Sequence, residues 1–182
     1  MADTVPHLPR EVESRLAGLR LMAFDVDGVL TDGRLWYAED GSEIKAFDAR
    51  DGHGLKMLRE AGLQLALITS RKSAIVERRA RELGIHHCLQ GIEDKLSGLR
   101  GILRSTNCRE DEAGFMGDDL LDLPVLARVG FAATVPDAPE AVRARAHLVT
   151  RRAGGRGAVR ELCEIILAAK GELAPMIARY LA

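Results

Sequence analysis

The chain has 182 residues, of which 47% are hydrophobic and 29% charged, as in ordinary soluble globular domains. Its formal net charge of −1, from 26 basic and 27 acidic side chains, argues against a protein of nucleic-acid or membrane surfaces. No apolar run approaches the roughly 20 residues of a membrane-spanning helix. We therefore expect one domain, residues 1–182, without a nucleic-acid or membrane partner.

The N-terminal residues and the cysteines bear on the compartment. Residues 1–18 lack an apolar core, so they are not expected to form a secretory signal. Cys88, Cys108 and Cys163 are odd in number and far apart, which favours reduced thiols. Both features favour a cytoplasmic protein.

Short apolar runs alternate with helical stretches, which predicts an α/β fold with a Rossmann-like parallel sheet flanked by helices. A β-hairpin is expected from residues 35–37 and 43–47, on either side of a turn-rich segment. The expected strands are residues 19–24, 63–69, 86–89, 113–116, 131–134 and 147–149. The expected helices are residues 54–61, 73–83, 95–105, 120–128, 139–144, 157–169 and 172–181. We divide the chain into a core of about 18–170, a hairpin insertion of about 34–48 and a tail of 171–182.

Polar side chains follow several of these strands. Asp25 and Asp27 come directly after the first, with Gly28 permitting a turn, and Thr69 and Asp118 fall at the ends of later strands. In open parallel sheets, ligands bind at the carboxyl ends of the strands. A cluster of carboxylates needs a cation, and hard oxygen ligands favour Mg²⁺.

The motif Asp-x-Asp-Gly at residues 25–28, taken alone, is as often a turn as a catalytic site. The Asp-x-Asp metal site of a glycosyltransferase also stays open, whereas an EF-hand lacks its further ligands. The chain, however, orders Asp-x-Asp-Gly-x-x-Thr-Asp-Gly, Leu-Ile-Thr, a lysine and Gly-Asp-Asp one after another. This ordered set resembles the haloacid dehalogenase superfamily of phosphotransferases.

The resemblance implies a role for each residue. It makes Asp25 the nucleophile and Asp27 the general acid and base, while Thr69 binds and Lys95 neutralises the transferring phosphoryl group. Mg²⁺ would be held by Asp25, the backbone carbonyl of Asp27, and Asp118. Two further acids would support the metal waters or cap a helix: Asp119 and Asp122.

Longer motifs make residues 18–170 similar to the 3-deoxy-D-manno-octulosonate 8-phosphate (KDO 8-phosphate) phosphatases of that superfamily. These motifs are residues 25–33, 45–47, 50–52, 68–73, 90–91, 117–120 and the glycine-rich block 153–161. Only about 40 residues separate Asp27 from Thr69, which leaves no room for a large cap domain. The resemblance then implies a capless fold and a homotetramer, in which the hairpin assembles the subunits, neighbouring chains complete each site, and the tail is a candidate lid.

Residues that would contact the sugar acid or shape its pocket follow by position: Asp48, Arg50, Asp51, Gly52, Lys56, Ser70, Arg71 and Arg79. Arg79 would act across a subunit boundary, although a solvated helix face is nearly as good an interpretation. Gly154–Gly157 is either a substrate-side loop or a turn that starts a helix. Asp48, His53 and Ser70 depart from the family pattern, which bears on the identity of the sugar acid.

We expect an Mg²⁺-dependent phosphatase that hydrolyses KDO 8-phosphate to KDO and phosphate through an aspartyl-phosphate, a step toward lipopolysaccharide. The alternative within the class is a phosphatase of nine-carbon sialic-acid-type 9-phosphates. A catalytically silent assembly domain is the alternative of a different class. The joint presence of Asp25, Asp27, Thr69, Lys95 and Asp118 favours an enzyme.

Overall fold

The main sheet is parallel, with the first strand near its centre. A computed structural model describes residues 8–181. Within that range the main sheet consists of β1 (Leu21–Phe24), β4 (Gln64–Thr69), β5 (His87–Gln90), β6 (Ala113–Met116), β7 (Phe131–Thr134) and β8 (Leu148–Val149). Their order is β5-β4-β1-β6-β7-β8, and each neighbouring pair is parallel. The α/β fold class predicted from the sequence is confirmed.

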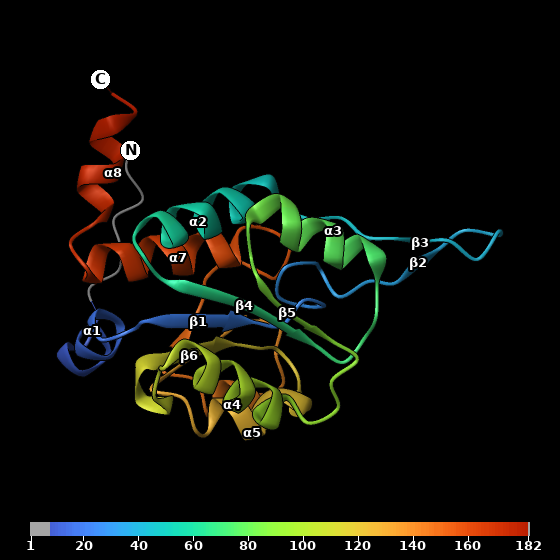
Figure 1. The fold of residues 1–182 in the computed structure, drawn as a ribbon, viewed down its shortest axis with the longest axis horizontal. Coiled ribbons are helices and arrows are strands. Elements are labelled where there is room, and N and C mark those ends of the chain that lie inside the picture. Colours follow the sequence, from blue (N-terminus) through green and yellow to red (C-terminus); the bar gives the residue numbers. More distant parts are fainter. Residues whose placement is uncertain (1–7, 182) are drawn as a thin grey trace.

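The helices are α1 (Arg10–Ala17), α2 (Ala49–Glu60), α3 (Ala74–Leu83), α4 (Lys95–Thr106), α5 (Leu123–Leu126), α6 (Glu140–Arg143), α7 (Ala158–Ala169) and α8 (Leu173–Arg179). Figure 1 shows α2, α3 and α7 on one side of the sheet and α4 and α5 on the other. Because helices cover both faces, the four residues of β1 are all apolar and buried.

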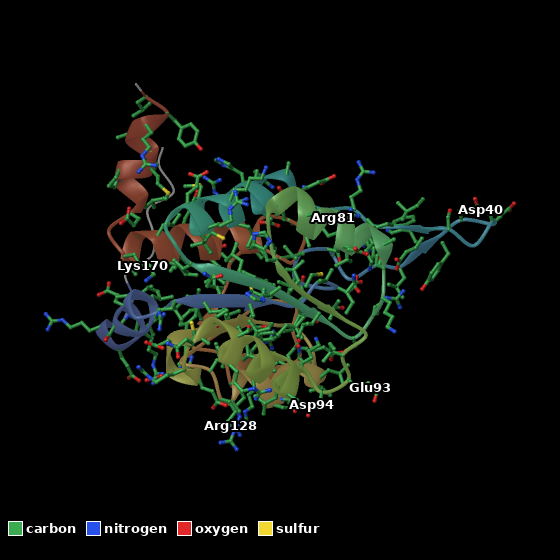
Figure 2. The ribbon with its side chains drawn as sticks, in the orientation of Figure 1. Asp40, Arg81, Glu93, Asp94, Arg128 and Lys170 are labelled. Carbon is green, nitrogen blue, oxygen red and sulfur yellow. The ribbon has the colours of Figure 1, made fainter. Side chains whose placement is uncertain are left out.

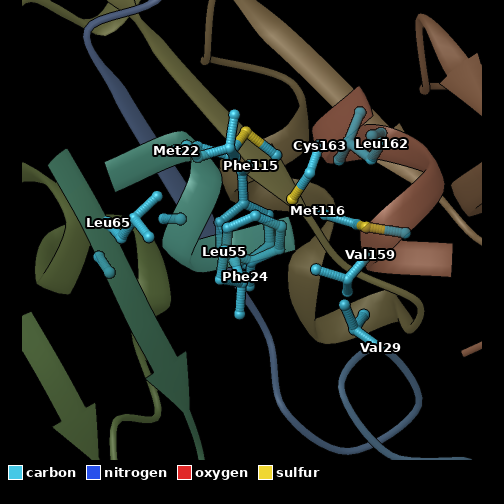
Figure 3. Close-up of a cluster of buried hydrophobic side chains, with 14 of the residues drawn as sticks. Met22, Phe24, Val29, Leu55, Leu65, Phe115, Met116, Val159, Leu162 and Cys163 are labelled. Atoms are coloured by element: carbon cyan, nitrogen blue, oxygen red, sulfur yellow. The ribbon is translucent and has the colours of Figure 1, made fainter. Parts of the chain in front are cut away.

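The core joins the central strands to the helices above them. Figure 3 shows Phe24 of β1, Phe115 of β6, Leu55 of α2 and Val159 of α7 as members of one buried cluster. Burying each such side chain contributes roughly 1.5–3 kcal/mol. The carboxyl ends of β1 and β6 therefore extend from a well-packed base.

A second, two-stranded sheet stands apart from the core. Antiparallel β2 (Trp36–Tyr37) and β3 (Glu43–Ile44) pair Trp36 with Ile44 and Tyr37 with Glu43. Gly41 allows the intervening turn, where its φ is 81°. The predicted hairpin is confirmed, and it projects from one end of the molecule (Figure 1).

Some element bounds differ from the predictions. α2 begins at Ala49, before the predicted Gly54, because Asp48 caps it by accepting a hydrogen bond from the Arg50 N–H. The single helix predicted for residues 120–128 is a 3₁₀ turn followed by the short α5, since Pro124 lacks the N–H that a continuous helix needs. The helix α1 was not predicted.

The tail helix α8 lies at the end of the molecule opposite the hairpin (Figure 1). There Tyr180 Oη lies 2.8 Å from Nε2 of His53 in α2. The described tail therefore does not cover the strand ends of its own chain. Across residues 8–181, no helix combines the length and apolar character needed to span a bilayer.

Candidate active site

The central strands bring together the polar residues predicted at their ends. β1 lies between β4 and β6, with Phe24 in register with Leu67 and Met116. Asp25 consequently follows β1 at the edge where Thr69 ends β4 and where Asp118 follows β6. Sequence periodicity located these strand ends, and the strand order makes them neighbours.

Of the predicted pair Asp25 and Asp27, Asp25 is the more deeply buried, at 7% exposed. Its Oδ1 accepts a hydrogen bond from the Val26 N–H at 2.7 Å, and its Oδ2 lies 2.8 Å from Lys95 Nζ. Burial, and then the charge of Asp122, raise the pKa of Asp25 to about 6, against the opposing effect of Lys95. Asp25 is thus held in one orientation, and the charge of Lys95 does not fully offset the burial of its carboxylate and the nearby negative charge.

Asp122 organises the loop after β6. Its Oδ1 accepts a hydrogen bond from Lys95 Nζ at 2.7 Å, and its Oδ2 accepts from the N–H groups of Asp118 and Asp119 at 2.9 and 3.1 Å. Both oxygens of this buried carboxylate are therefore occupied by the chain itself. Asp122 joins the lysine that holds Asp25 to the loop that carries Asp118.

Asp118 has what Asp122 lacks, an available oxygen. Its Oδ1 is buried without a hydrogen-bond partner. Burial and the charges of Asp25, Asp122 and Asp119 raise the pKa of Asp118 to about 7. Such a carboxyl is stabilised in its charged form by a cation.

A metal ion fits this arrangement. Oxygens of Asp25, Asp118 and Asp122 lie within 4.8 Å of one another. Because the Asp122 oxygens already accept hydrogen bonds, Asp25 and Asp118 are the side chains suited to bind the ion. Gly28 leaves room for Asp118, since a Cβ there would lie 1.9 Å from its Oδ2. An all-oxygen site of this kind favours Mg²⁺ over softer ions.

The side chain of Asp27 faces the hairpin. Its Oδ1 forms an ion pair with Lys45, which follows β3, and Thr31 Oγ1 lies 3.4 Å from the same oxygen. Arg71 Nε lies 3.6 Å from the other oxygen. The Asp27 carboxylate does not belong to the cluster formed by Asp25, Asp118 and Asp122, so its backbone carbonyl remains its predicted contribution to the metal.

Thr69 and Ser70 present hydroxyl groups at the end of β4. Thr69 is buried, and its Oγ1 accepts a hydrogen bond from the Arg71 N–H at 3.3 Å. The hydroxyl of Ser70 is enclosed and has no hydrogen-bond partner among the described residues. Both follow or end β4 at the edge of the sheet where Asp25 follows β1, and contacts of these hydroxyls with a phosphoryl group or substrate remain predictions.

The predicted substrate residues on α2 make local contacts. Asp48 pairs with Arg50 at 2.7 Å, and Gly52 lies against Arg79, since a Cβ at Gly52 would be 2.2 Å from the guanidinium. Arg79 itself lies over the Phe47 ring, 5.6 Å from its centroid. Substrate contacts by these residues, and by the exposed Lys56, remain predictions.

Asp51 has a clear structural position. Its carboxylate accepts hydrogen bonds from the Arg160 and Gly157 N–H groups, at 2.7 and 3.3 Å, and so caps the start of α7. Burial is the main reason that its pKa is raised, to about 6. Asp51 shapes the junction of α2 and α7, and direct contact between this buried side chain and a sugar acid remains a prediction.

The glycine-rich block packs against the loop that follows Asp27. A Cβ at Gly154 would lie 1.8 Å from the Gly28 carbonyl oxygen, and the Gly155 N–H donates to the Val29 carbonyl at 2.9 Å. The block also lines a cavity of about 390 Å³ together with Gly28, Asp32, Gly33, Arg34, Asp118, Val135 and Asp137. It is therefore both the turn that starts α7 and one wall of a pocket beside Asp118.

Sequence reasoning did not identify the partners of Asp27. Lys45 entered only within a family motif, and Glu43 and Tyr37 only as hairpin residues. One feature of the sequence pointed to these residues, because the charged Glu43 and Lys45 flank the apolar Ile44 in a short hairpin. Nothing in that pattern indicated which acid they meet.

Comparison with known proteins identifies the family, although no family model matches the chain. The 3-deoxy-D-manno-octulosonate 8-phosphate phosphatase KdsC of Yersinia pestis is 44% identical over 163 residues, 90% of this chain and 87% of that protein. The crystal structure of the phosphatase of that name from Moraxella catarrhalis, in complex with magnesium, phosphate and KDO, has a TM-score of 0.93 at 43% identity. It covers 94% of this chain and 98% of that chain.

A cobalt-bound deoxy-D-mannose-octulosonate 8-phosphate phosphatase from Haemophilus influenzae has a TM-score of 0.85 at 38% identity, over 88% of this chain and 94% of that one. These similarities extend over nearly the whole chain and include both sequence and fold. The chain belongs to the 3-deoxy-D-manno-octulosonate 8-phosphate phosphatase family of the haloacid dehalogenase superfamily.

Proposed function

We propose that this protein hydrolyses KDO 8-phosphate to KDO and inorganic phosphate, with Asp25 as the nucleophile. The observation that carries the proposal is the enclosed carboxylate of Asp25, oriented by the Val26 N–H and Lys95 beside the unpartnered Asp118 Oδ1. The magnesium, phosphate and KDO in the Moraxella catarrhalis structure support the same substrate.

In the first step, a carboxylate oxygen of Asp25 attacks phosphorus and forms an aspartyl-phosphate as the bond to the sugar oxygen breaks. Asp27 transfers a proton to that leaving oxygen. Lys95 and the hydroxyl of Thr69 meet the charge on the phosphoryl oxygens. In the second step, Asp27 accepts a proton from the water that attacks phosphorus, and Asp25 is regenerated.

Magnesium is the proposed cofactor. Asp25, Asp118 and the backbone carbonyl of Asp27 would hold it, and when bound it supplies positive charge that offsets the phosphoryl oxygens and the crowded carboxylates. Asp122 holds Asp118 and Lys95 in place, and Asp119 caps the following turn through the Leu120 N–H.

Substrate choice is the direct test of this function. We expect a kcat/KM at least about tenfold higher for KDO 8-phosphate than for a nine-carbon sugar-acid 9-phosphate, because longer sugars need additional contacts in a shaped pocket. Phosphate release with each compound, in the presence of Mg²⁺, measures this ratio. Equal preference would contradict the assignment to KDO 8-phosphate, and a reversed preference would favour the nine-carbon substrates.

The proposed assembly is a homotetramer with sites completed by neighbouring subunits. Its support is the hairpin, where Trp36 is 56% and Ile44 57% exposed, beside the exposed Leu35 and Tyr37. Large apolar side chains gathered on a projecting hairpin are typical of an interaction surface. Arg79 would then act across a subunit boundary, and the tail would be a lid over a neighbour's site.

Replacing Trp36 and Ile44 together by Asp should break this assembly, because charged side chains cannot be buried unpaired. We expect the mass in solution, from light scattering, to fall from that of four chains to that of one or two. Asp40→Asn, at the exposed hairpin turn, is the matched control. A wild-type protein with the mass of one chain would contradict the tetramer.

We also propose that the protein acts in the cytoplasm, on the route to lipopolysaccharide. The odd, unpaired cysteines support the compartment: Cys88, Cys108 and Cys163 are free. The name of the relatives, which specifies KDO 8-phosphate, supports the route.

A further inference from the structure

Asp27, which transfers protons in the proposed mechanism, is paired with a lysine of the hairpin. Lys45 Nζ forms an ion pair with Asp27 Oδ1. The proposed mechanism gives Lys45 no role, and the inference below rests on that mechanism because it concerns the position of Asp27.

The side chain of Lys45 is buried, although the hairpin to which it belongs is largely exposed. Its side chain is 1% exposed, against 18% for that of Asp27. Removing an ammonium group from water is costly unless carboxylates face it. Asp27 and Glu43, whose Oε1 lies 3.5 Å from Lys45 Nζ, are those carboxylates.

Arg71 meets the same two acids from the loop after β4. Its Nε lies 3.6 Å from Asp27 Oδ2, and its Nη2 donates to Glu43 Oε1 at 3.0 Å and to Tyr37 Oη at 2.9 Å. Two acids and two bases therefore form a group with balanced charge. Glu43 contacts both cations, so the same group joins the hairpin to the loop after β4.

Each oxygen of Asp27 thus faces a cation from a different segment. Lys45 comes from the hairpin and Arg71 from the end of β4, while Asp27 itself follows β1. A carboxyl held at both oxygens has little freedom to rotate, and proton transfer requires a donor placed within hydrogen-bond distance of the leaving oxygen.

We propose that Lys45 is a positioning residue, which holds the Asp27 carboxyl where it delivers a proton to the leaving sugar oxygen. As the bond from phosphorus to that oxygen breaks, the proton moves from the Asp27 carboxyl to the oxygen, and Asp27 is left as a carboxylate beside Lys45 and Arg71. Lys45 acts on the reaction only through Asp27.

The test compares two leaving groups in Lys45→Met, which keeps most of the side-chain volume and removes the charge. KDO 8-phosphate loses a strongly basic alkoxide, which needs the proton, whereas p-nitrophenyl phosphate loses a weakly basic phenolate, which does not. The ratio kcat/KM reports only the steps up to the formation of the aspartyl-phosphate, so the later use of Asp27 as a base does not enter.

We expect kcat/KM for KDO 8-phosphate to fall about 100-fold, in the range of a lost general acid. For p-nitrophenyl phosphate it should stay within about fivefold of the wild type. Asp27→Asn should show the same selectivity for the leaving group, and Lys45→Met should add little to it in the double variant, because both changes disable one proton transfer. Lys45→Arg should restore part of the rate.

Arg128→Met is the control. It also removes one positive charge, but from an exposed side chain on the side of the sheet opposite α2, α3 and α7 (Figure 2). Light scattering and thermal unfolding of each variant separate loss of assembly or fold from loss of proton transfer. Equal losses on both phosphate esters, or full additivity with Asp27→Asn, would overturn the role of Lys45. A wild-type protein that hydrolyses p-nitrophenyl phosphate but not KDO 8-phosphate would instead overturn the proposed substrate. The comparison of leaving groups would then use another alkyl phosphate that the protein hydrolyses.

Discussion

Asp25→Asn should abolish phosphate release, with kcat lower by roughly 10⁴-fold or more, the scale seen when a nucleophile is removed. The amide that replaces the carboxylate is a poor nucleophile and cannot form the aspartyl-phosphate. It is nearly the same size, so the packing around Val26 and Lys95 should persist. The measurement is phosphate release from KDO 8-phosphate, with thermal unfolding and light scattering on the same preparations.

Asp111→Asn is the matched control for this change, because Asp111 is exposed and lies in the 3₁₀ turn before β6. It should retain the wild-type rate. If Asp25→Asn turned over substrate at the wild-type rate, Asp25 would not be the nucleophile. A wild-type protein that assembled but released no phosphate from any sugar-acid phosphate would favour the silent assembly domain.

Lys95→Met should reduce both activity and stability, because Lys95 is the cation shared by Asp25 and Asp122, at 2.8 and 2.7 Å. Loss of charge stabilisation at the phosphoryl group should lower kcat by roughly 10²–10³-fold. In the absence of Mg²⁺, removing one partner from a buried ionic cluster should cost about 3 kcal/mol of unfolding free energy. Urea denaturation with and without chelator measures this loss.

The stability loss in Lys95→Met should depend on pH. Burial raises the pKa of Asp25 to about 6 and that of Asp118 to about 7, and Lys95 opposes both shifts. Without Lys95 both pKa values should rise further. The folded protein then holds protons that the unfolded chain releases, so its stability falls as pH rises through the folded-state pKa values.

We therefore expect the difference in unfolding free energy between Lys95→Met and the wild type to grow from about pH 5 to about pH 8 without metal. Added Mg²⁺ should recover more stability at the higher pH, where the carboxylates are charged. Arg104→Met, an exposed cation on the same helix, should show neither effect. A loss in Lys95→Met that is independent of pH would contradict the ionic role.

The sequence by itself determined the fold class and the positions of the strand ends. Apolar runs and glycines are local signals, and they placed β6 and β7 correctly to the residue. They also placed Asp25 directly after a strand and Asp118 two residues after the end of another. The ordered motifs added the family, which the comparisons confirm. The break in the helix predicted for residues 120–128 also has a local signal, Pro124.

The tertiary structure decided which side chains meet. Asp122 contacts Lys95, 27 residues away in sequence, and Asp51 caps a helix that begins 107 residues later. Lys45 reaches Asp27 only because the chain turns back through the hairpin. Strand and helix periodicity depends on neighbours in sequence, whereas these contacts depend on how separate elements pack, and no local pattern encodes that packing. Asp25 and Asp27 could therefore be located from the sequence, but the contacts that orient their carboxylates could not.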